Sequence, residues 1–200
     1  TFLSLIQTTQ KSIREGHIKK PNFILILGDI HGHKRLNNNL IKSQQYVFTT
    51  LHNEFADTPI IYVFGNNDSP QKNYGKFTAH KLSPYLVATQ RSKWKNGFLN
   101  TGKICKNAQS FPCINQQNTE NGYFSAILKP KLRLIGLNSV IFSISNLFRR
   151  DAKQELIWLQ EQLNIAARSN EQVIIAMHIP PGYNVYNNEA FWRRSELKEF

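Results

Sequence analysis

The stretch Phe23-Ile24-Leu25-Ile26-Leu27-Gly28-Asp29 decides the fold. It is a continuous apolar run that stops at a glycine and an aspartate. A strand that is buried on both faces has this composition, and such strands belong to sheets covered by helices. The stretch therefore predicts an α/β protein in which Asp29 lies at the carboxyl end of a central strand.

The rest of the chain continues the same alternation. Two more apolar runs end on polar residues: 60–64 stops before Gly65-Asn66, and 173–177 stops at His178. Helices are predicted at 3–13, 34–55 and 151–167 and from 189 onward, and a hairpin is predicted at 123–128 and 132–137. The polar residues from 69 to 122 are interpreted as a long insertion with short helices.

Composition indicates one packed domain over residues 1–200. Hydrophobic residues make up 40% and aromatic residues 12% of the 200 residues, which suffices for a core. The chain starts without Met and stops inside a predicted helix, so we expect the domain to be incomplete at both ends. No apolar run reaches the roughly 20 residues that a membrane-spanning helix needs.

The net charge of +12 favours an anionic partner. The charges are scattered, so a generally basic surface explains them equally well, and no stable nucleic-acid partner is expected. Cys105 and Cys113 are eight positions apart. In an exported protein they would close a disulfide, and in a cytosolic protein they would be two separate thiols.

Four predicted strands are followed at their carboxyl ends by Asp29, Asn66, Asn138 and His178. Because the carboxyl ends of such strands meet at one edge of a sheet, we expect these side chains to converge. Carboxylate and amide oxygens with an imidazole suit Zn²⁺, Mn²⁺ or Fe²⁺, and an aspartate can bridge two such ions. A site with two metal ions is typical of phosphoryl transfer.

Successive blocks of the sequence resemble the calcineurin-like metallophosphoesterases, and among them the acid sphingomyelinase-like phosphodiesterases. The blocks are Gly28-Asp29 with His33 four residues after the aspartate, Gly65-Asn66-Asn67-Asp68, Leu137-Asn138, Trp158-Leu159 and His178-Ile179-Pro180-Pro181-Gly182-Tyr183. Their order and spacing cover nearly the whole chain.

This resemblance implies a four-layer α/β/β/α sandwich with two mixed sheets. It implies hydrolysis of a phosphorylated, anionic substrate, a phosphodiester, with two divalent metal ions (zinc, or else manganese or iron) in an exported protein. Asp29 would bridge both ions, while Asn66 and His178 would bind the second ion. His33 would contact the substrate phosphate, and Asn138 would support the ligands from behind.

Three departures from the family pattern matter. The Asp-x-His and Gly-His-x-His blocks are not among these residues, and we expect them upstream and downstream. Asn67 stands where the family usually has a histidine that protonates the leaving group, and an amide has no useful pKa for this role. We therefore expect His33 or His31 to be the catalytic acid and Asn67 to face the substrate. An endopolyphosphatase-like hydrolase and an inactive binding protein with this fold are the alternatives.

The serine/threonine protein phosphatases offer a rival alignment. In that alignment Asp29 and His31 would both bind the first metal ion. The family needs a second Gly-Asp block before the asparagine block, but Asp57 is the only aspartate between His33 and Gly65, and no glycine precedes it. The sequence therefore favours the sphingomyelinase-like alignment.

Overall fold

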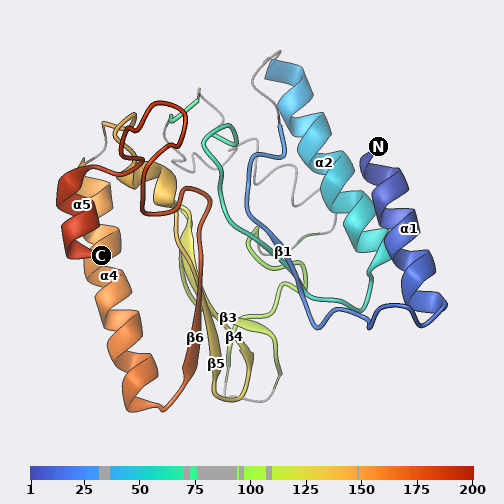
Figure 1. Cartoon of the computed structure of the whole chain (residues 1–200). Helices are drawn as coiled ribbons and strands as arrows, with labels where there is room; N and C mark the ends of the chain where they lie inside the picture. Colours follow the sequence, from blue (N-terminus) through green and yellow to red (C-terminus); the bar gives the residue numbers. More distant parts are fainter. Residues whose placement is uncertain (32–36, 70–72, 76–93, 95–96, 107–109, 148) are drawn as a thin grey trace.

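The structure is a computed structural model of the chain and describes residues 1–31, 37–69, 73–75, 94, 97–106, 110–147 and 149–200 (Figure 1). Helices and strands alternate along it, as the sequence predicts. In chain order they are α1 (Phe2–Arg14), β1 (Ile24–Ile26), α2 (Asn37–Glu54), β2 (Ile60–Tyr62), β3 (Cys113–Asn118), β4 (Tyr123–Lys129), β5 (Leu132–Gly136), the 3₁₀ helix η1 (Ser139–Phe142), α4 (Arg149–Arg168), β6 (Gln172–Ala176) and α5 (Arg194–Glu199).

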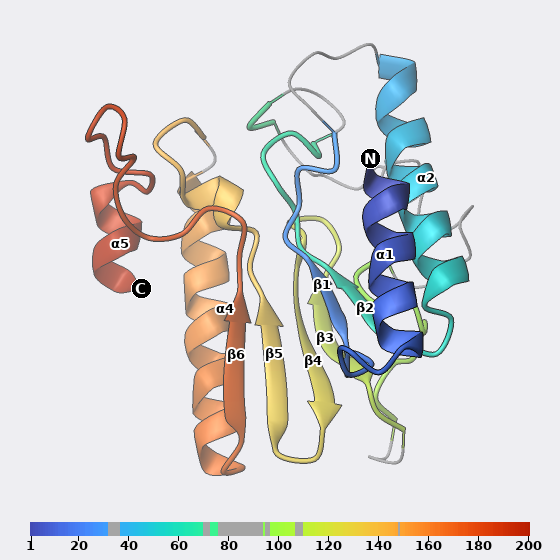
Figure 2. The ribbon, with the colours of Figure 1, turned by 45° about the vertical axis from the view of Figure 1, so that its right-hand side comes forward.

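The strands form two sheets between layers of helices. In the first sheet β1 and β2 are parallel, and Leu99 adds an antiparallel bridge to Ile61. The second sheet has the order β3-β4-β5-β6 and is antiparallel except for the parallel pair β5–β6. Helices α1 and α2 lie on the outer side of the first sheet, and α4 covers the outer side of the second (Figure 2). The predicted four-layer α/β/β/α class is confirmed.

Aromatic side chains hold the two sheets together. Phe98, next to β2, stacks on Phe124 of β4 with ring centroids 4.7 Å apart. Phe64 packs edge-on against Phe98 at 5.8 Å. All three side chains are at most 2% exposed. Such closely packed rings contribute more than their buried area alone, so the sheets are held at a defined separation.

The three apolar strands differ in burial. Ile60, Ile61 and Tyr62 of β2 are completely buried, as predicted. In β1 and β6, by contrast, the apolar side chains are mostly half-buried, and Leu27 just after β1 is 45% exposed. The expectation of full burial was wrong for these two strands, because each is an edge strand among the described residues.

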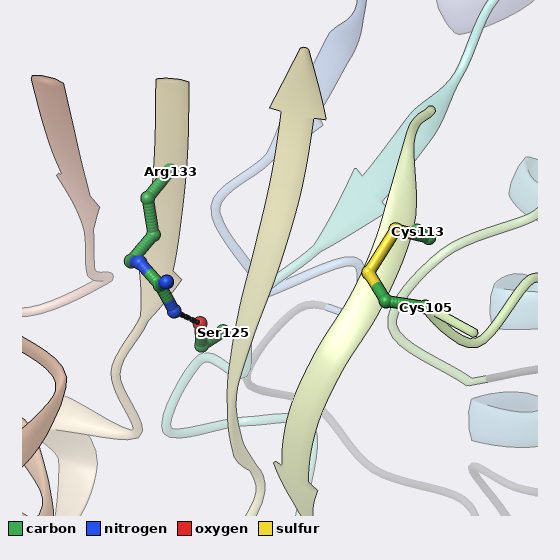
Figure 3. The surroundings of a disulfide bond; sticks show 4 residues. All are labelled: Cys105, Cys113, Ser125 and Arg133. Carbon is green, nitrogen blue, oxygen red and sulfur yellow. Dashed lines mark hydrogen bonds between the residues drawn. A yellow bond between two sulfur atoms is a disulfide. The ribbon is translucent and has the colours of Figure 1, made fainter. Parts of the chain in front are cut away.

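Strand β3 lies within the stretch that we expected to form short helices, and this expectation was wrong. Its sequence, Cys-Ile-Asn-Gln-Gln-Asn, lacks the apolar alternation typical of strands. Two contacts fix it instead. Cys113 forms a disulfide with Cys105 (Figure 3), and the side chain of Gln116 accepts hydrogen bonds from Trp158 and Gln162 of α4.

A buried arginine joins the second sheet to α4. Arg133 of β5 is 3% exposed. It donates to the hydroxyl of Ser125 at 2.7 Å (Figure 3), to Gln162 of α4 at 3.1 Å and to the carboxylate of Glu171 at 2.7 Å. A buried charge is tolerated only when it is paired in this way, so these partners fix how α4 sits on the sheet.

The last helix is shorter than predicted. We expected it from 189 onward, but α5 begins at Arg194. The indole of Trp192 is fully buried and donates to the carbonyl of Ile179 at 2.9 Å, while Trp192 also bridges to Ser143. These contacts hold the residues before α5 in an extended path. Within the described ranges, no helix is long and apolar enough to cross a membrane.

Candidate metal site

Three of the four predicted strand-end residues meet at one edge of the sandwich. Asp29 follows β1, Asn66 follows β2 and His178 follows β6. The imidazole Nε2 of His178 lies 3.0 Å from Oδ1 of Asn66 and 3.5 Å from Oδ2 of Asp29. One nitrogen and two oxygens from both sheets therefore converge on a small volume.

Two glycines allow the loops that carry Asp29 and Asn66 to approach each other. Gly28 has a φ of +87°, and a Cβ placed on it would lie 2.2 Å from the backbone nitrogen of Gly65. A Cβ on Gly65 would lie 2.2 Å from Oδ1 of Asp29. No side chain fits at either position, so both glycines are needed for this geometry.

Hydrogen bonds orient the imidazole and the amide. Nδ1 of His178 lies 2.6 Å from the carbonyl oxygen of Leu27, and because a carbonyl only accepts, Nδ1 carries the proton. The amide nitrogen of Asn66 donates to Oδ1 of Asn73 at 2.7 Å, which turns the Asn66 oxygen toward His178. With neutral His178, Nε2 and this oxygen are both acceptors.

Acceptors that face each other at this distance need a cation or a proton between them. A divalent ion bound by Nε2 of His178, Oδ1 of Asn66 and a carboxylate oxygen of Asp29 would satisfy all three atoms, and this donor set suits zinc, manganese or iron. Among the described residues there is no group of three or more His, Cys, Asp and Glu side chains that could hold a metal. The described site therefore depends on the amide of Asn66.

The charges of Asp29 and His178 support each other. Burial alone would raise the pKa of the Asp29 carboxyl, but hydrogen bonds from His178 and Asn67 outweigh it and hold this pKa below its ordinary value. Burial alone would lower the pKa of His178, but its hydrogen bond and ion pair with Asp29 raise it. Asp29 is thus kept ionised, as a metal ligand or an ion-pair partner must be.

Asn67 lies against the carboxylate of Asp29. Its backbone N–H donates to Oδ1 of Asp29 and its side-chain amide donates to Oδ2, both at 2.8 Å. The structure thus brings Asn67 into the site, in contact with the proposed bridging ligand. Its predicted contact with substrate stays a prediction.

Asn138 has other hydrogen-bond partners. Its side chain is fully buried and donates to the carbonyl of Asn121 at 2.6 Å, and none of its hydrogen bonds to described residues reaches Asp29, Asn66 or His178. The neighbouring Ser139 does support the site, since its hydroxyl accepts from the N–H of Ile179 at 2.8 Å, next to His178. The sequence carried no signal for this contact.

Of the two residues predicted to be the catalytic acid, only His31 lies among the described residues. His33 lies outside the described residues. His31, two residues after Asp29, is half-buried, and its buried Nε2 has no hydrogen-bond partner among the described residues. An unpartnered ring nitrogen close to Asp29 is compatible with contact to a bound group.

Sequence comparison decides the family. Residues 3–199 match the calcineurin-like phosphoesterases. The chain belongs to the calcineurin-like phosphoesterase family. This family implies phosphoester hydrolysis and divalent metal ions, which agrees with the convergence of Asp29, Asn66 and His178.

Several proteins named as phosphodiesterases are similar to most of the chain. It is 31% identical to sphingomyelinase phosphodiesterase C of Dictyostelium discoideum over 84% of the chain and 36% of that relative. It is 25% identical to acid sphingomyelinase-like phosphodiesterase 3b of Homo sapiens over 90% of the chain and 38% of the relative. It is 25% identical to sphingomyelin phosphodiesterase 1 of Caenorhabditis elegans over 83% of the chain and 30% of that relative. The chain thus spans about a third of the length of these relatives.

Proposed function

We propose that this chain is part of a phosphodiesterase with two metal ions, in which Asp29 bridges the ions and Asn66 and His178 bind the second one. The observation that carries the proposal is the convergence of Nε2 of His178 on Oδ1 of Asn66 at 3.0 Å and on Oδ2 of Asp29 at 3.5 Å. Zinc is the first choice for this donor set, and manganese and iron also suit it. The remaining ligands would come from outside these residues.

The residues of the site divide the work of hydrolysis. When bound, two such ions supply a hydroxide nucleophile and neutralise charge on the phosphoryl oxygens. Leu27 holds the proton of His178 on Nδ1 and so keeps Nε2 free to bind. Asn67 orients the carboxylate of Asp29. His33 or His31 would hold the phosphate and protonate the leaving oxygen.

A phosphodiester is the substrate that we propose. The three relatives are named as phosphodiesterases, and the net charge of +12 favours an anionic substrate. We also propose that the protein is exported. The disulfide between Cys105 and Cys113 supports this, because such bonds persist in oxidising compartments.

A second candidate is a protein that binds metal and ligand without turnover. Asn67 favours it, because an amide held by the carboxylate of Asp29 cannot supply a proton. A third candidate is an endopolyphosphatase-like hydrolase, which would use the same metal ligands on a chain of phosphates.

The three candidates separate in one set of assays on the full-length protein. With Mn²⁺ or Zn²⁺ we expect hydrolysis of bis(4-nitrophenyl) phosphate in preference to inorganic polyphosphate. His178→Ala should abolish most turnover, whereas His17→Ala, whose imidazole is 71% exposed on the loop after α1, should not. Metal binding without turnover would favour the binding protein, and shortening of polyphosphate would favour the endopolyphosphatase. Unchanged turnover in His178→Ala would overturn the proposal.

A further inference from the structure

Asp68 is a buried carboxylate at the end of the block Gly65-Asn66-Asn67-Asp68, and no role was predicted for it from the sequence. Its side chain is completely buried. Oδ2 accepts hydrogen bonds from the backbone N–H groups of Asp29 and of Gly65, both at 2.7 Å. Oδ1 accepts from the N–H of Ile30 at 3.2 Å. One carboxylate therefore binds the backbone of both loops that carry metal-site residues.

The backbone of Asp29 needs such support. Its φ is +54°, in the left-handed region that residues other than glycine rarely adopt. The N–H that donates to Asp68 belongs to this same residue. Because charge-assisted hydrogen bonds are the strong ones, the carboxylate offsets the unfavourable conformation and fixes the direction of the Asp29 side chain.

The other end of the contact lies in the loop that follows β2. Oδ2 also binds Gly65, the residue before Asn66. Oδ2 of Asp68 thus links the backbone of Asp29, one proposed ligand, to Gly65, which precedes Asn66, the other proposed ligand.

We infer that Asp68 is a positioning residue, whose carboxylate holds Asp29 and Asn66 at the separation that the metal site requires. The inference rests on the proposed function where it concerns metal binding. The claim that Asp68 fixes the loops that carry Asp29 and Asn66 does not depend on the proposed function. Within the described part of the chain, the backbone N–H groups that donate to the Asp68 carboxylate belong to residues 29, 30 and 65, which are proposed ligands or neighbours of proposed ligands.

The test compares Asp68→Ala and Asp68→Asn with Asn100→Ala in the full-length protein. Asn100 is a matched control: it is 7% exposed, and its side chain accepts from the N–H of Ile60 at 2.8 Å, at the opposite end of β2. Hydrogen exchange of backbone amides is measured without metal, and Mn²⁺ affinity is measured by calorimetry. Thermal unfolding shows how far each variant is destabilised.

We expect Asp68→Ala to lose exchange protection at residues 29, 30 and 65 and to bind Mn²⁺ about 10–100-fold more weakly, the usual cost of losing a partner that orients a ligand. Asp68→Asn should be intermediate, because its amide oxygen can keep the two short hydrogen bonds. Asn100→Ala should lose stability but keep both the protection and the Mn²⁺ affinity.

Wild-type protection and Mn²⁺ affinity in Asp68→Asn and Asp68→Ala would overturn the inference, as would equal losses of affinity in Asn100→Ala. If Asp68→Ala does not fold, Asp68→Asn alone decides between these outcomes. Failure of the wild-type protein to bind Mn²⁺ would instead count against the proposed function. In that case hydrogen exchange at residues 29, 30 and 65 would still show whether Asp68 positions the two loops.

Discussion

Nε2 of His178 lies 3.0 Å from Oδ1 of Asn66, although 112 positions separate the two residues in the chain. Asn66 follows a strand of the first sheet and His178 follows a strand of the second. Their contact therefore joins the two sheets at the edge where the proposed metal site lies. Any change to either side chain tests both the site and the way in which the sheets meet.

Two variants of Asn66 distinguish the role of its side-chain oxygen from that of its side-chain nitrogen. Asn66→Ala removes the proposed ligand and should weaken Mn²⁺ binding by more than about 100-fold, beyond the cost of losing an outer partner. Asn66→Asp keeps an oxygen ligand but loses the hydrogen bond to Asn73, so its loss should stay within about 10–100-fold. Calorimetric titration checks both values. Equal affinities for the two variants would remove Asn66 from the ligand set.

Asn67→His tests the missing proton donor. An imidazole titrates near neutral pH, so at this position it can protonate a leaving group that an amide cannot. We expect kcat to rise at least about 10-fold for an alkyl phosphodiester and little for bis(4-nitrophenyl) phosphate, whose phenolate leaves without help. Asn67→Gln is the control, because it changes shape without adding a titrating group. A similar gain on both substrates would contradict this role.

Gly65→Ala should disrupt the site by steric overlap. The added Cβ would lie 2.2 Å from Oδ1 of Asp29, so the loops must separate, at a cost of about 1–3 kcal/mol in the free energy of unfolding. Mn²⁺ affinity should fall as well. Gly16→Ala is the matched control: its φ is +75°, but nothing lies within 4 Å of its Cβ. It should lose some stability and keep its affinity for Mn²⁺.

Glu155 makes the stability of the fold depend on pH. Its burial in α4 raises the pKa of the carboxyl well above 4.5, against the opposing effect of the hydrogen bond from the N–H of Asn138. The folded state therefore binds this proton more tightly than the unfolded state does. The contribution of Glu155 to stability should be fully present below about pH 4.5 and should be lost as the pH rises through the folded pKa.

Glu155→Gln removes this titration and keeps an acceptor for Asn138. At neutral pH it should stabilise the protein by roughly 1–3 kcal/mol, since it removes a negative charge whose burial is unfavourable. Denaturant titrations at several pH values check this. Glu161→Gln, on the exposed side of the same helix, should change neither the stability nor its dependence on pH.

Reduction of the disulfide should affect stability but not the metal site. Cys105 and Cys113 close a loop with a sequence separation of 8, for which chain entropy predicts a stabilisation of about 2–3 kcal/mol. Cys113 pairs with Ile127 in the second sheet, at the end opposite to the candidate site. The double variant Cys105→Ala/Cys113→Ala should therefore unfold at lower temperature with unchanged Mn²⁺ affinity. A large loss of affinity would show that the two ends of the sheet are coupled.

Apolar runs predicted the main strands because burial selects residues by polarity. The runs before Asp29, Asn66 and His178 became β1, β2 and β6. The parallel pairing of β1 with β2 places Asp29 and Asn66 at one edge of the first sheet, whereas His178 reaches them from the second sheet. Strand β3 escaped prediction because its sequence lacks apolar alternation. Cys113 is held by the disulfide to Cys105, and Gln116 is held by Trp158 and Gln162 of α4, which are distant in sequence. The extended path before α5 likewise depends on the burial of Trp192.

The site residues divide in the same way. The convergence of Asp29, Asn66 and His178 was predictable because each follows an apolar run, and their role as metal ligands stays a prediction. Asp68, Ser139 and Asn73 were not predictable, because they act by hydrogen bonds to backbone groups or to another amide, and no spacing in the sequence marks such contacts. Asn138 ends a strand as well, but its amide turns toward Asn121.

The buried partners of Arg133 have a consequence for the order of folding. They join β4, β5 and α4, which follow one another closely in the chain, whereas the contact between His178 and Leu27 spans 151 positions. Local contacts form at a lower entropic cost than distant ones. We therefore expect the second sheet and α4 to assemble early and the metal site to form last, when the two halves dock, so that competence to bind a metal would mark the completion of folding.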